Sequence, residues 1–264
     1  MTLSINEIYN QDCLEGLDQI KSETVDLLLT DPPFGIDFDK VGSQYNRKQK
    51  ELGRLYIEIH EDYYDFTLQW LQAAWKAMKP TASGFIFSGW NRLGDILNAL
   101  TETGFRLVNH LIWKYQFGVF TKKRFVTSHY HILYFTKLAA KDDNLRTFNR
   151  ISEYSSSPGK LYFEDVWRIK RDYQKGGDKT PTRLPLAITD KCIRIASNEG
   201  DLVLEPFLGS GSVVLSCIKY NRRYLGFEIS EPIFTIAKKR IEEMRNQFEE
   251  KSNKLDNWLI KTKN

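Results

Sequence analysis

The chain has 264 residues, of which 41% are hydrophobic, and this length is enough to bury the core of one large domain. A formal net charge of +4 is mildly basic, so the composition permits a nucleic-acid partner without requiring one. There is no run of about 18 apolar residues and no secretory leader pattern, so we expect a soluble cytoplasmic protein with no membrane contact.

Three cysteines, Cys13, Cys192 and Cys217, show neither a paired framework nor the spacing of metal ligands. Such a set predicts reduced thiols, with no disulfide and no zinc site. We therefore expect chemistry that needs no metal.

Short apolar segments alternate with helical patterns along most of the chain, and seven of them are expected as strands. The expected strands are 8–9, 25–30, 84–88, 107–113, 131–135, 201–205 and 224–228. One short helix is expected to begin at Leu14, and four more are expected over 62–78, 93–104, 213–220 and 235–249. This alternation predicts a mostly parallel sheet covered by helices on both faces, with an antiparallel pair at its edge.

The apolar segment 25–30 stops abruptly at Asp31, Pro32, Pro33 and Phe34. Two successive prolines with fixed φ cannot continue a strand or a helix, so the chain must leave the sheet at Asp31. Ligands of open α/β sheets sit beyond the carboxyl ends of the strands, which would place Asp31 and Phe34 at the binding crevice. The alternative is a loop that merely ends a strand.

Two long polar segments interrupt the pattern of strands and helices. Residues 35–62 form either a lid over a site or an exposed loop. Segment 139–178 has no core periodicity and is either functional or a disordered insertion. Basic residues in the loop 115–130 and in segment 139–178 are expected to contact phosphates, with solvated surface as the alternative; they are Lys122, Lys123, Arg124, Arg168, Lys170 and Arg171.

A second motif begins at Glu205 and runs through a glycine turn to Ser212, where a helix starts. Glycines let a ligand lie against bare backbone, and the helix start suits a carboxylate or a phosphate. A P-loop needs a lysine after Gly211, and a dinucleotide fingerprint needs a small residue where Val214 stands. About twenty residues after the glycines comes Glu228, either a ribose ligand or a helix cap.

These motifs resemble the amino-methyltransferases of DNA. Residues 31–34 match the family's catalytic motif Asp/Asn/Ser-Pro-Pro-aromatic, and residues 205–212 match Asp-Pro-Phe-x-Gly-Ser-Gly-Thr with Glu205 and Ser212 as departures. Residues 179–186 are similar to Lys-His-Pro-Thr-Gln-Lys-Pro-Leu, with Thr180 in place of the histidine and Leu184 in place of the lysine. The resemblance spans residues 10–236, with the catalytic motif before the cofactor motif.

The resemblance implies one methyltransferase domain over 1–264, built on a seven-stranded, mostly parallel sheet. Its parts would be a catalytic half (1–138), a target-recognition insertion (139–178) and a cofactor half (179–264). The implied cofactor is S-adenosylmethionine, bound by Asp12, Cys13, Thr180, Thr182, Glu205, Pro206, Phe207, Gly209, Ser210, Gly211, Ser212 and Glu228. The implied catalytic residues are Asp31, Pro32, Pro33 and Phe34.

The implied reaction is methylation of the exocyclic N6 amino group of an adenine flipped out of DNA. Aspartate at the first motif position favours adenine in this family, and cytosine-N4 is the first alternative. RNA, a protein glutamine and a nicotinamide-dependent redox reaction are further alternatives. The resemblance also allows a cognate restriction enzyme as a partner, and leaves open whether the chain is a monomer or a homodimer.

Overall fold

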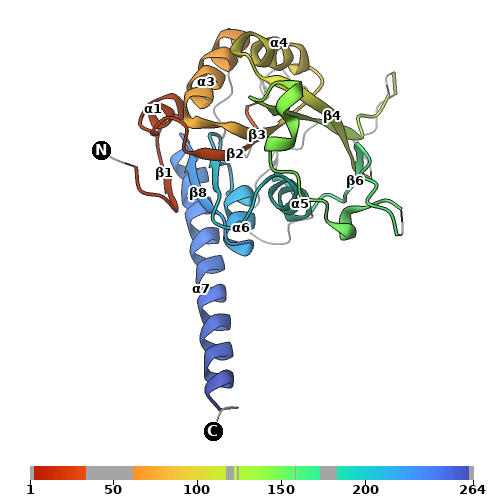
Figure 1. The fold of residues 1–264 in the computed structure, drawn as a ribbon. Helices are drawn as coiled ribbons and strands as arrows, with labels where there is room; N and C mark the ends of the chain where they lie inside the picture. Colours follow the sequence, from red (N-terminus) through yellow and green to blue (C-terminus); the bar gives the residue numbers. More distant parts are fainter. Residues whose placement is uncertain are drawn as a thin grey trace.

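The computed structural model describes residues 3–33, 62–116, 122–123, 125–157, 159–172 and 183–261. Its centre is an eight-stranded sheet with the order β1-β8-β7-β2-β3-β5-β4-β6 (Figure 1). The strands are β1 (Glu7–Tyr9), β2 (Val25–Thr30), β3 (Met78–Ser88), β4 (Arg106–Lys114), β5 (His129–Thr136), β6 (Val166–Arg168), β7 (Leu202–Glu205) and β8 (Arg223–Phe227). The helices are α1 (Cys13–Asp18), α3 (Tyr63–Ala77), α4 (Leu93–Thr103), α5 (Leu186–Ala196), α6 (Ser212–Lys219) and α7 (Glu231–Lys261), with 3-10 turns η1 (Ala140–Leu145) and η2 (Ser152–Tyr154).

The direction of the strands decides which residues can meet. Every pairing in the sheet is parallel except the two made by β5, which runs against both β3 and β4. Seven strands therefore end, and β5 begins, along one side of the sheet, which we call the carboxyl edge. Residues that directly follow these seven strands are brought to that edge whatever their distance in sequence.

Helices cover both faces of the sheet, as the sequence predicted. In Figure 1, α1, α3 and α4 lie on one face and α5, α6 and α7 on the other. Side chains of β2 alternate between the two cores: Leu28 packs with the first group of helices, whereas Leu27 and Leu29 pack with the second. Burial on both faces explains why this strand is a continuous apolar run rather than an alternating one.

The sheet has eight strands rather than the predicted seven, because segment 139–178 contributes β6. This strand pairs in parallel with β4, and only its central residue, Trp167, turns into the core, where it is 6% exposed. A strand of three residues with one buried side chain is too short to show the alternation of apolar and polar residues that predicts a strand. As β6 takes the outermost position, the antiparallel pair β4 and β5 lies one strand inside the edge.

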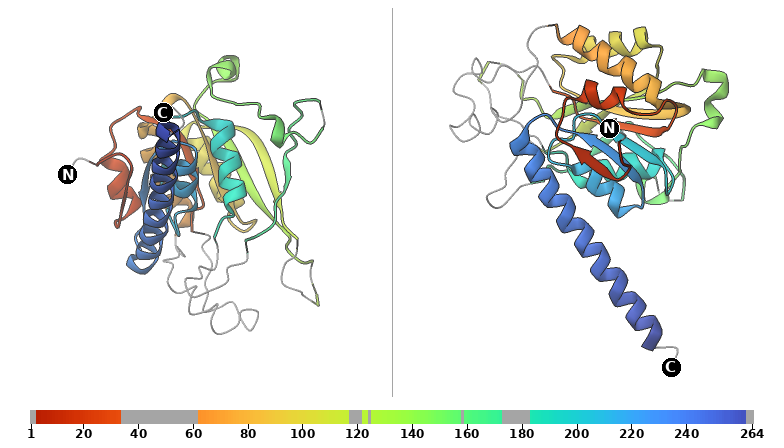
Figure 2. Two further views of the ribbon diagram at one scale, coloured as in Figure 1. Left: turned by 90° about the horizontal axis from the view of Figure 1, so that it is seen from below. Right: turned by 90° about the vertical axis from the view of Figure 1, so that its left-hand side faces the viewer.

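Two helices differ from the sequence predictions. Helix α5 was not predicted; it follows Pro185 at its N-cap and buries Ile188, Cys192 and Ile193. Helix α7 extends well beyond the predicted 235–249 and projects from the body of the protein (Figures 1 and 2). The helix is long but rich in charged residues. No helix in the described part of the chain is both long enough and apolar enough to cross a membrane.

Candidate functional site

The carboxyl edge gathers most of the predicted site residues on four adjacent strands. Asp31 follows β2, the glycine motif at 205–212 follows β7, Glu228 follows β8, and Asp12 with Cys13 follows β1. Since neighbouring strands lie about 4.8 Å apart, these turns form one continuous stretch of the edge. Three predicted residues, Phe34, Thr180 and Thr182, lie outside the described residues.

The turn that begins at Asp31 is held from two sides. The residue before it, Thr30, is buried and donates a hydrogen bond of 2.7 Å from Oγ1 to Oε1 of Glu205 on β7. On the other side, Tyr63 donates from its hydroxyl to the carbonyl oxygen of Pro33 at 2.8 Å. Tyr63 is 3% exposed, and the guanidinium of Arg92 lies 4.7 Å from the centre of its ring.

Sequence analysis did not identify Tyr63 as a site residue. It opens helix α3 and lies 30 positions from Pro33, so only the fold brings the two together. A buried tyrosine hydroxyl usually finds a hydrogen-bond partner, and here that partner is the backbone of the predicted catalytic motif.

Glu205 is a buried carboxyl group beside another acid. It is 3% exposed, and burial raises its pKa well above its usual range. The hydrogen bond from Thr30 and one from the backbone of Phe207 lower the pKa, whereas the negative charges of Asp31 and Glu228 raise it further. The carboxyl groups of Glu205 and Asp31 thus lie close to each other, and a positive charge bound beside them would be stabilised.

The two glycines of the turn have left-handed backbones but different surroundings. A Cβ at Gly211 (φ 82°) would lie 3.4 Å from Cδ1 of Ile241 and 3.5 Å from Cβ of Ala237, both on α7. Among the described residues, a Cβ at Gly209 (φ 51°) would meet only the carbonyl oxygen of Phe207, at 4.0 Å. A Cβ at Gly211 would therefore be in ordinary contact with α7, and only a larger side chain would press on that helix. The described residues leave the space beside Gly209 open.

Helix α7 also fixes the residue between these glycines. Arg240 donates to the carbonyl oxygen of Ser210 and, at 2.9 Å, to its hydroxyl. The hydroxyl of Ser212, the first residue of α6, is buried and has no hydrogen-bond partner among the described residues. An orphaned buried hydroxyl at a helix start is an observation that fits a bound polar ligand.

Glu228 ties the glycine turn to the start of α7. Its Oε2 accepts a hydrogen bond of 2.9 Å from the backbone N–H of Gly209, and its Oε1 accepts one of 2.9 Å from that of Ser230. The bond to Ser230 is the cap-like contact that sequence analysis kept as an alternative. Burial raises the pKa of Glu228 to about 7, although the backbone bonds act in the opposite direction.

The turn after β1 lies against the turn after β8. Asn10 donates from Nδ2 to the carbonyl oxygen of Glu228 at 2.7 Å, and Asp12 caps α1 by accepting from the N–H of Leu14 at 2.7 Å. Burial raises the pKa of Cys13 to about 12, and the charges of Asp12 and Glu228 add to the effect. Asp12, Cys13 and Glu228 are therefore close; that they share one ligand remains a prediction.

The side chain of Phe207 packs against α3. Its ring lies 5.4 Å from that of Trp70, nearly edge-on, and 5.9 Å from that of Phe66. These contacts join the predicted cofactor half to the predicted catalytic half. Pro206, the residue before it, is buried.

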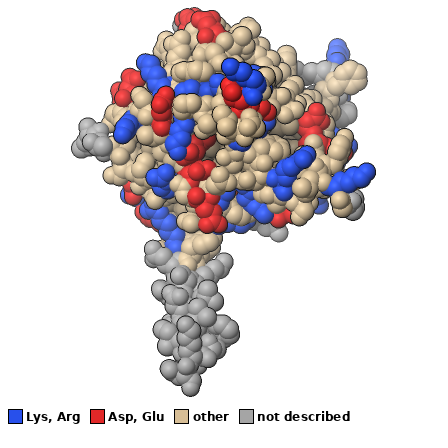
Figure 3. All heavy atoms as spheres, viewed as in Figure 1, with Lys and Arg blue, Asp and Glu red and all other residues tan. Residues whose placement is uncertain are grey.

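The predicted phosphate contacts leave the sheet on the same side as the site. Lys122 and Lys123 lie between β4 and β5, and Arg168, Lys170 and Arg171 lie at and beyond the end of β6; all five are exposed, whereas Arg124 lies outside the described residues. The guanidinium of Arg171 lies 4.0 Å from the ring centre of Tyr115 and 5.4 Å from that of Tyr130. On the face shown in Figure 3, basic and acidic side chains are interspersed.

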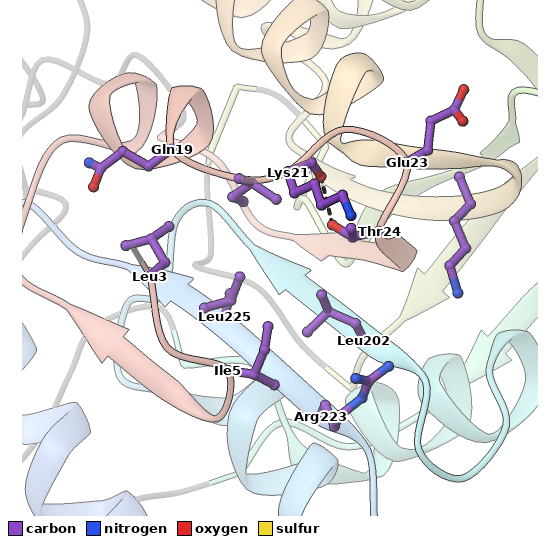
Figure 4. Close-up of a pocket in the computed structure, with 11 residues that line it drawn as sticks. Leu3, Ile5, Gln19, Lys21, Glu23, Thr24, Leu202, Arg223 and Leu225 are labelled. Carbon is purple, nitrogen blue, oxygen red and sulfur yellow. Dashed lines mark hydrogen bonds between the residues drawn. The ribbon is translucent and has the colours of Figure 1, made fainter. Parts of the chain in front are cut away.

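A cavity of about 390 Å³ lies at the opposite edge of the sheet, where the strands begin (Figure 4). Leu202, Arg223 and Leu225 line it from β7 and β8, together with residues that precede β2. None of the predicted site residues contributes to this cavity. In the part of the chain that the structure describes, His, Cys, Asp and Glu form no group of three placed to hold a metal ion.

Comparisons with known proteins support the resemblance to the amino-methyltransferases of DNA. A DNA methylase family model, N6_N4_Mtase, matches residues 25–239. The type II methyltransferase M.HpaI of Haemophilus parainfluenzae is 27% identical over 245 residues, covering 90% of this chain and 74% of that protein. The crystal structure of an M1.HpyAVI complex with S-adenosylmethionine is 25% identical, covers 89% of this chain and 98% of that chain, and has a TM-score of 0.65.

A third relative supports the fold alone. The PvuII DNA methyltransferase, which is cytosine-N4-specific, is 19% identical, covers 93% of each chain and has a TM-score of 0.67. The predicted α/β fold with a mostly parallel sheet, and S-adenosylmethionine as the cofactor, are confirmed by these comparisons.

Proposed function

This chain belongs to the N6/N4 family of DNA methylases, and from that premise we propose that it methylates the exocyclic N6 amino group of an adenine in DNA. The observation that carries the proposal is the meeting of Asp31 with Glu205 and Glu228 at the carboxyl edge, on adjacent strands. A catalytic motif and a cofactor motif that are far apart in sequence thereby share one site.

The residues of this site fit S-adenosylmethionine. Glu228 offers carboxylate oxygens for ribose hydroxyls. In the part of the chain that the structure describes, the space beside the Gly209 backbone is open and the hydroxyl of Ser212 has no partner. The start of α6 suits the carboxylate of the methionine moiety. Asp12 and Cys13 would lie near the adenine. When bound, the cofactor supplies a methyl group on a positively charged sulfur.

Asp31 and the carbonyl of Pro32 would act on the amino group that receives the methyl. Its lone pair is conjugated with the base, so hydrogen bonds from the two amino hydrogens to these oxygens favour a pyramidal nitrogen. In the transfer, a bond forms between this nitrogen and the methyl carbon, the carbon–sulfur bond breaks with its electron pair left on the sulfur, and the nitrogen then releases one proton to water. The chain contributes positioning and charge stabilisation.

Hydrogen bonds to the neighbours of Asp31 keep its backbone in place for this role. Thr30 is bound to Glu205, and Pro33 is bound to Tyr63. Because the target amino group is inaccessible in a stacked duplex, the base must leave the helix to reach Asp31.

The proposed DNA contacts are the exposed basic residues beyond β4 and β6, and the proposed target-recognition segment is 139–178. The basic residues lie towards the carboxyl edge, since β4 and β6 end there. Residues 139–165 instead connect the end of β5 to the start of β6, both of which lie at the opposite edge. DNA affinity should fall as salt rises, and the slope of log affinity against log salt measures the number of neutralised phosphates. Reversing the charge of Lys122 and Lys123 should make this slope less steep by about 0.9 for each phosphate that the variant no longer neutralises. An unchanged slope would assign both lysines to ordinary solvated surface.

Adenine is favoured over cytosine because Asp31 occupies the first position of the catalytic motif. The test incubates the protein with labelled S-adenosylmethionine and genomic DNA that lacks this modification, then digests the DNA to nucleosides for mass spectrometry. We expect the digest to contain labelled N6-methyldeoxyadenosine. N4-methyldeoxycytidine would support the first alternative, and label on RNA or protein but not on DNA would contradict the proposal.

A further inference from the structure

The turn after β3, residues 89–92, leaves the carboxyl edge beside the predicted catalytic turn. Strands β2 and β3 are neighbours in parallel register, and Thr30 pairs with Ile86. Asp31 therefore leaves the sheet next to the last residues of β3, which ends at Ser88. Gly89 and Trp90 follow directly.

Trp90 is unusual among the tryptophans in its exposure. It is 72% exposed, whereas Trp70, Trp113 and Trp167 are at most 6% exposed. A single exposed apolar side chain needs no explanation by itself. An indole in water at the rim of a catalytic site is a different case, because aromatic faces are the usual surface on which proteins hold unstacked bases.

The turn that carries Trp90 is anchored to the catalytic turn. Arg92 lies over the ring of Tyr63 at 4.7 Å, and the hydroxyl of Tyr63 binds the carbonyl of Pro33 at 2.8 Å. Arg92 is also paired with Asp95 in the first turn of α4, at 3.3 Å. A single buried side chain therefore links the turn of Trp90 to the backbone next to Asp31, and a fixed backbone is what a contact residue needs.

We propose that the indole of Trp90 is a stacking surface for the target base after it has left the DNA helix. The inference rests on the proposed function. Stacking uses the face of any base, so Trp90 would stabilise the extrahelical state without reading the sequence. It would thus affect how well duplex DNA is used, and leave both cofactor binding and the recognition sequence unchanged.

The test compares Trp90→Phe, Trp90→Leu and Trp90→Ala on a duplex that the parent methylates. We expect kcat/KM to decrease in the order Trp, Phe, Leu, Ala, with a loss of roughly 5- to 150-fold for alanine. With 2-aminopurine at the target position, the fluorescence increase that reports an unstacked base should shrink in the same order. Affinity for S-adenosylmethionine and the melting temperature should stay at the parent values.

Leu107→Ala is the matched control, since Leu107 is 39% exposed near the start of β4, at the opposite edge. It should behave like the parent in every assay. Alanine and leucine variants of Trp90 with parental kcat/KM would overturn the inference and leave the proposed function intact. Loss of cofactor affinity in the Trp90 series would also overturn it, and a parent that methylates no DNA would remove the proposed function together with the inference.

Discussion

The acidic residues at the two edges of the sheet have different charged neighbours, and β2 has one such residue near each of its ends. At its start, Asp26 accepts a hydrogen bond of 2.5 Å from Lys79 and one of 2.9 Å from the backbone N–H of Leu202. Just past its end, Asp31 lies near Glu205, whose hydrogen bonds come from a hydroxyl and a backbone amide. At the first edge Lys79 offsets the repulsion between Asp26 and Asp201, whereas at the second edge the charges of Asp31 and Glu228 raise the pKa of Glu205.

This difference indicates which edge is built for stability and which for ligands. Crowded carboxyl groups raise each other's pKa and cost free energy in the folded protein. A ligand that brings positive charge and hydroxyl donors reduces that cost. S-adenosylmethionine has a sulfonium, an ammonium and ribose hydroxyls, so the carboxyl edge suits it better than the apolar cavity at the other edge.

The largest effect is expected from the two ends of β2. Asp31→Ala should lower kcat by at least about 100-fold, as for the loss of a preorganised polar group, and leave cofactor affinity within a few-fold. Asp26→Ala is the control: it should lower stability by about 1–3 kcal/mol and leave kcat nearly unchanged. Steady-state kinetics and chemical denaturation measure both, and an active Asp31→Ala enzyme would contradict the catalytic role.

The glycine turn offers a second matched pair. Gly209→Val should block cofactor binding, because its side chain enters the open space at the turn, while Gly211→Val should chiefly displace α7. Both positions have positive φ, so both variants lose some stability. Calorimetry at a temperature where both remain folded separates the two effects. Stronger loss of affinity at Gly211 than at Gly209 would refute this division.

Glu228 should make cofactor binding depend on pH. Its pKa of about 7 lies above the ordinary value of 4.5, so the protein takes up a proton on folding between these values. The stabilising effect of this proton is complete below pH 4.5 and is lost as the pH rises through 7.

Ribose hydroxyls bind the ionised form, so cofactor affinity should rise between about pH 6 and 8. Glu228→Gln should flatten that rise, and Glu228→Ala should weaken binding by about 1–3 kcal/mol at high pH. Calorimetric titration across this range provides the measurement. A parental profile in the glutamine variant would assign the pH dependence to another group.

The smallest effect is expected at Tyr63, which positions the catalytic turn without touching the substrate. Tyr63→Phe removes one hydrogen bond to Pro33 and keeps the ring under Arg92, so kcat should fall by about 2- to 13-fold, equivalent to about 0.5–1.5 kcal/mol. KM for DNA and cofactor affinity should change little. An equal fall in stability and no change in kcat would make Tyr63 an ordinary core residue.

Strand ends were the most predictable part of this molecule. An apolar run that meets Asp31 and two prolines, or Glu205 and a glycine turn, signals both the element and its end in a few adjacent residues. The parallel sheet then brings these ends to one edge, which is why their placement side by side could be predicted from the sequence.

Features that depend on contacts between distant segments were not predictable. Tyr63 reaches Pro33 across 30 positions, and the packing role of Gly211 depends on where α7 lies. Arg171 was predicted as a phosphate contact, yet its guanidinium also lies over the rings of Tyr115 and Tyr130. Such contacts are set by tertiary packing, for which the local sequence carries no period.

Photolabelling with radioactive S-adenosylmethionine, followed by peptide mapping, tests most directly that the carboxyl edge is the cofactor site. We expect label in peptides that contain residues 10–13, 31–33 or 205–212, with protection by unlabelled cofactor and none by nicotinamide nucleotides. Label confined to the segment 20–24, where Ile20, Lys21, Glu23 and Thr24 line the cavity at the opposite edge, or protection by nicotinamide nucleotides, would contradict it.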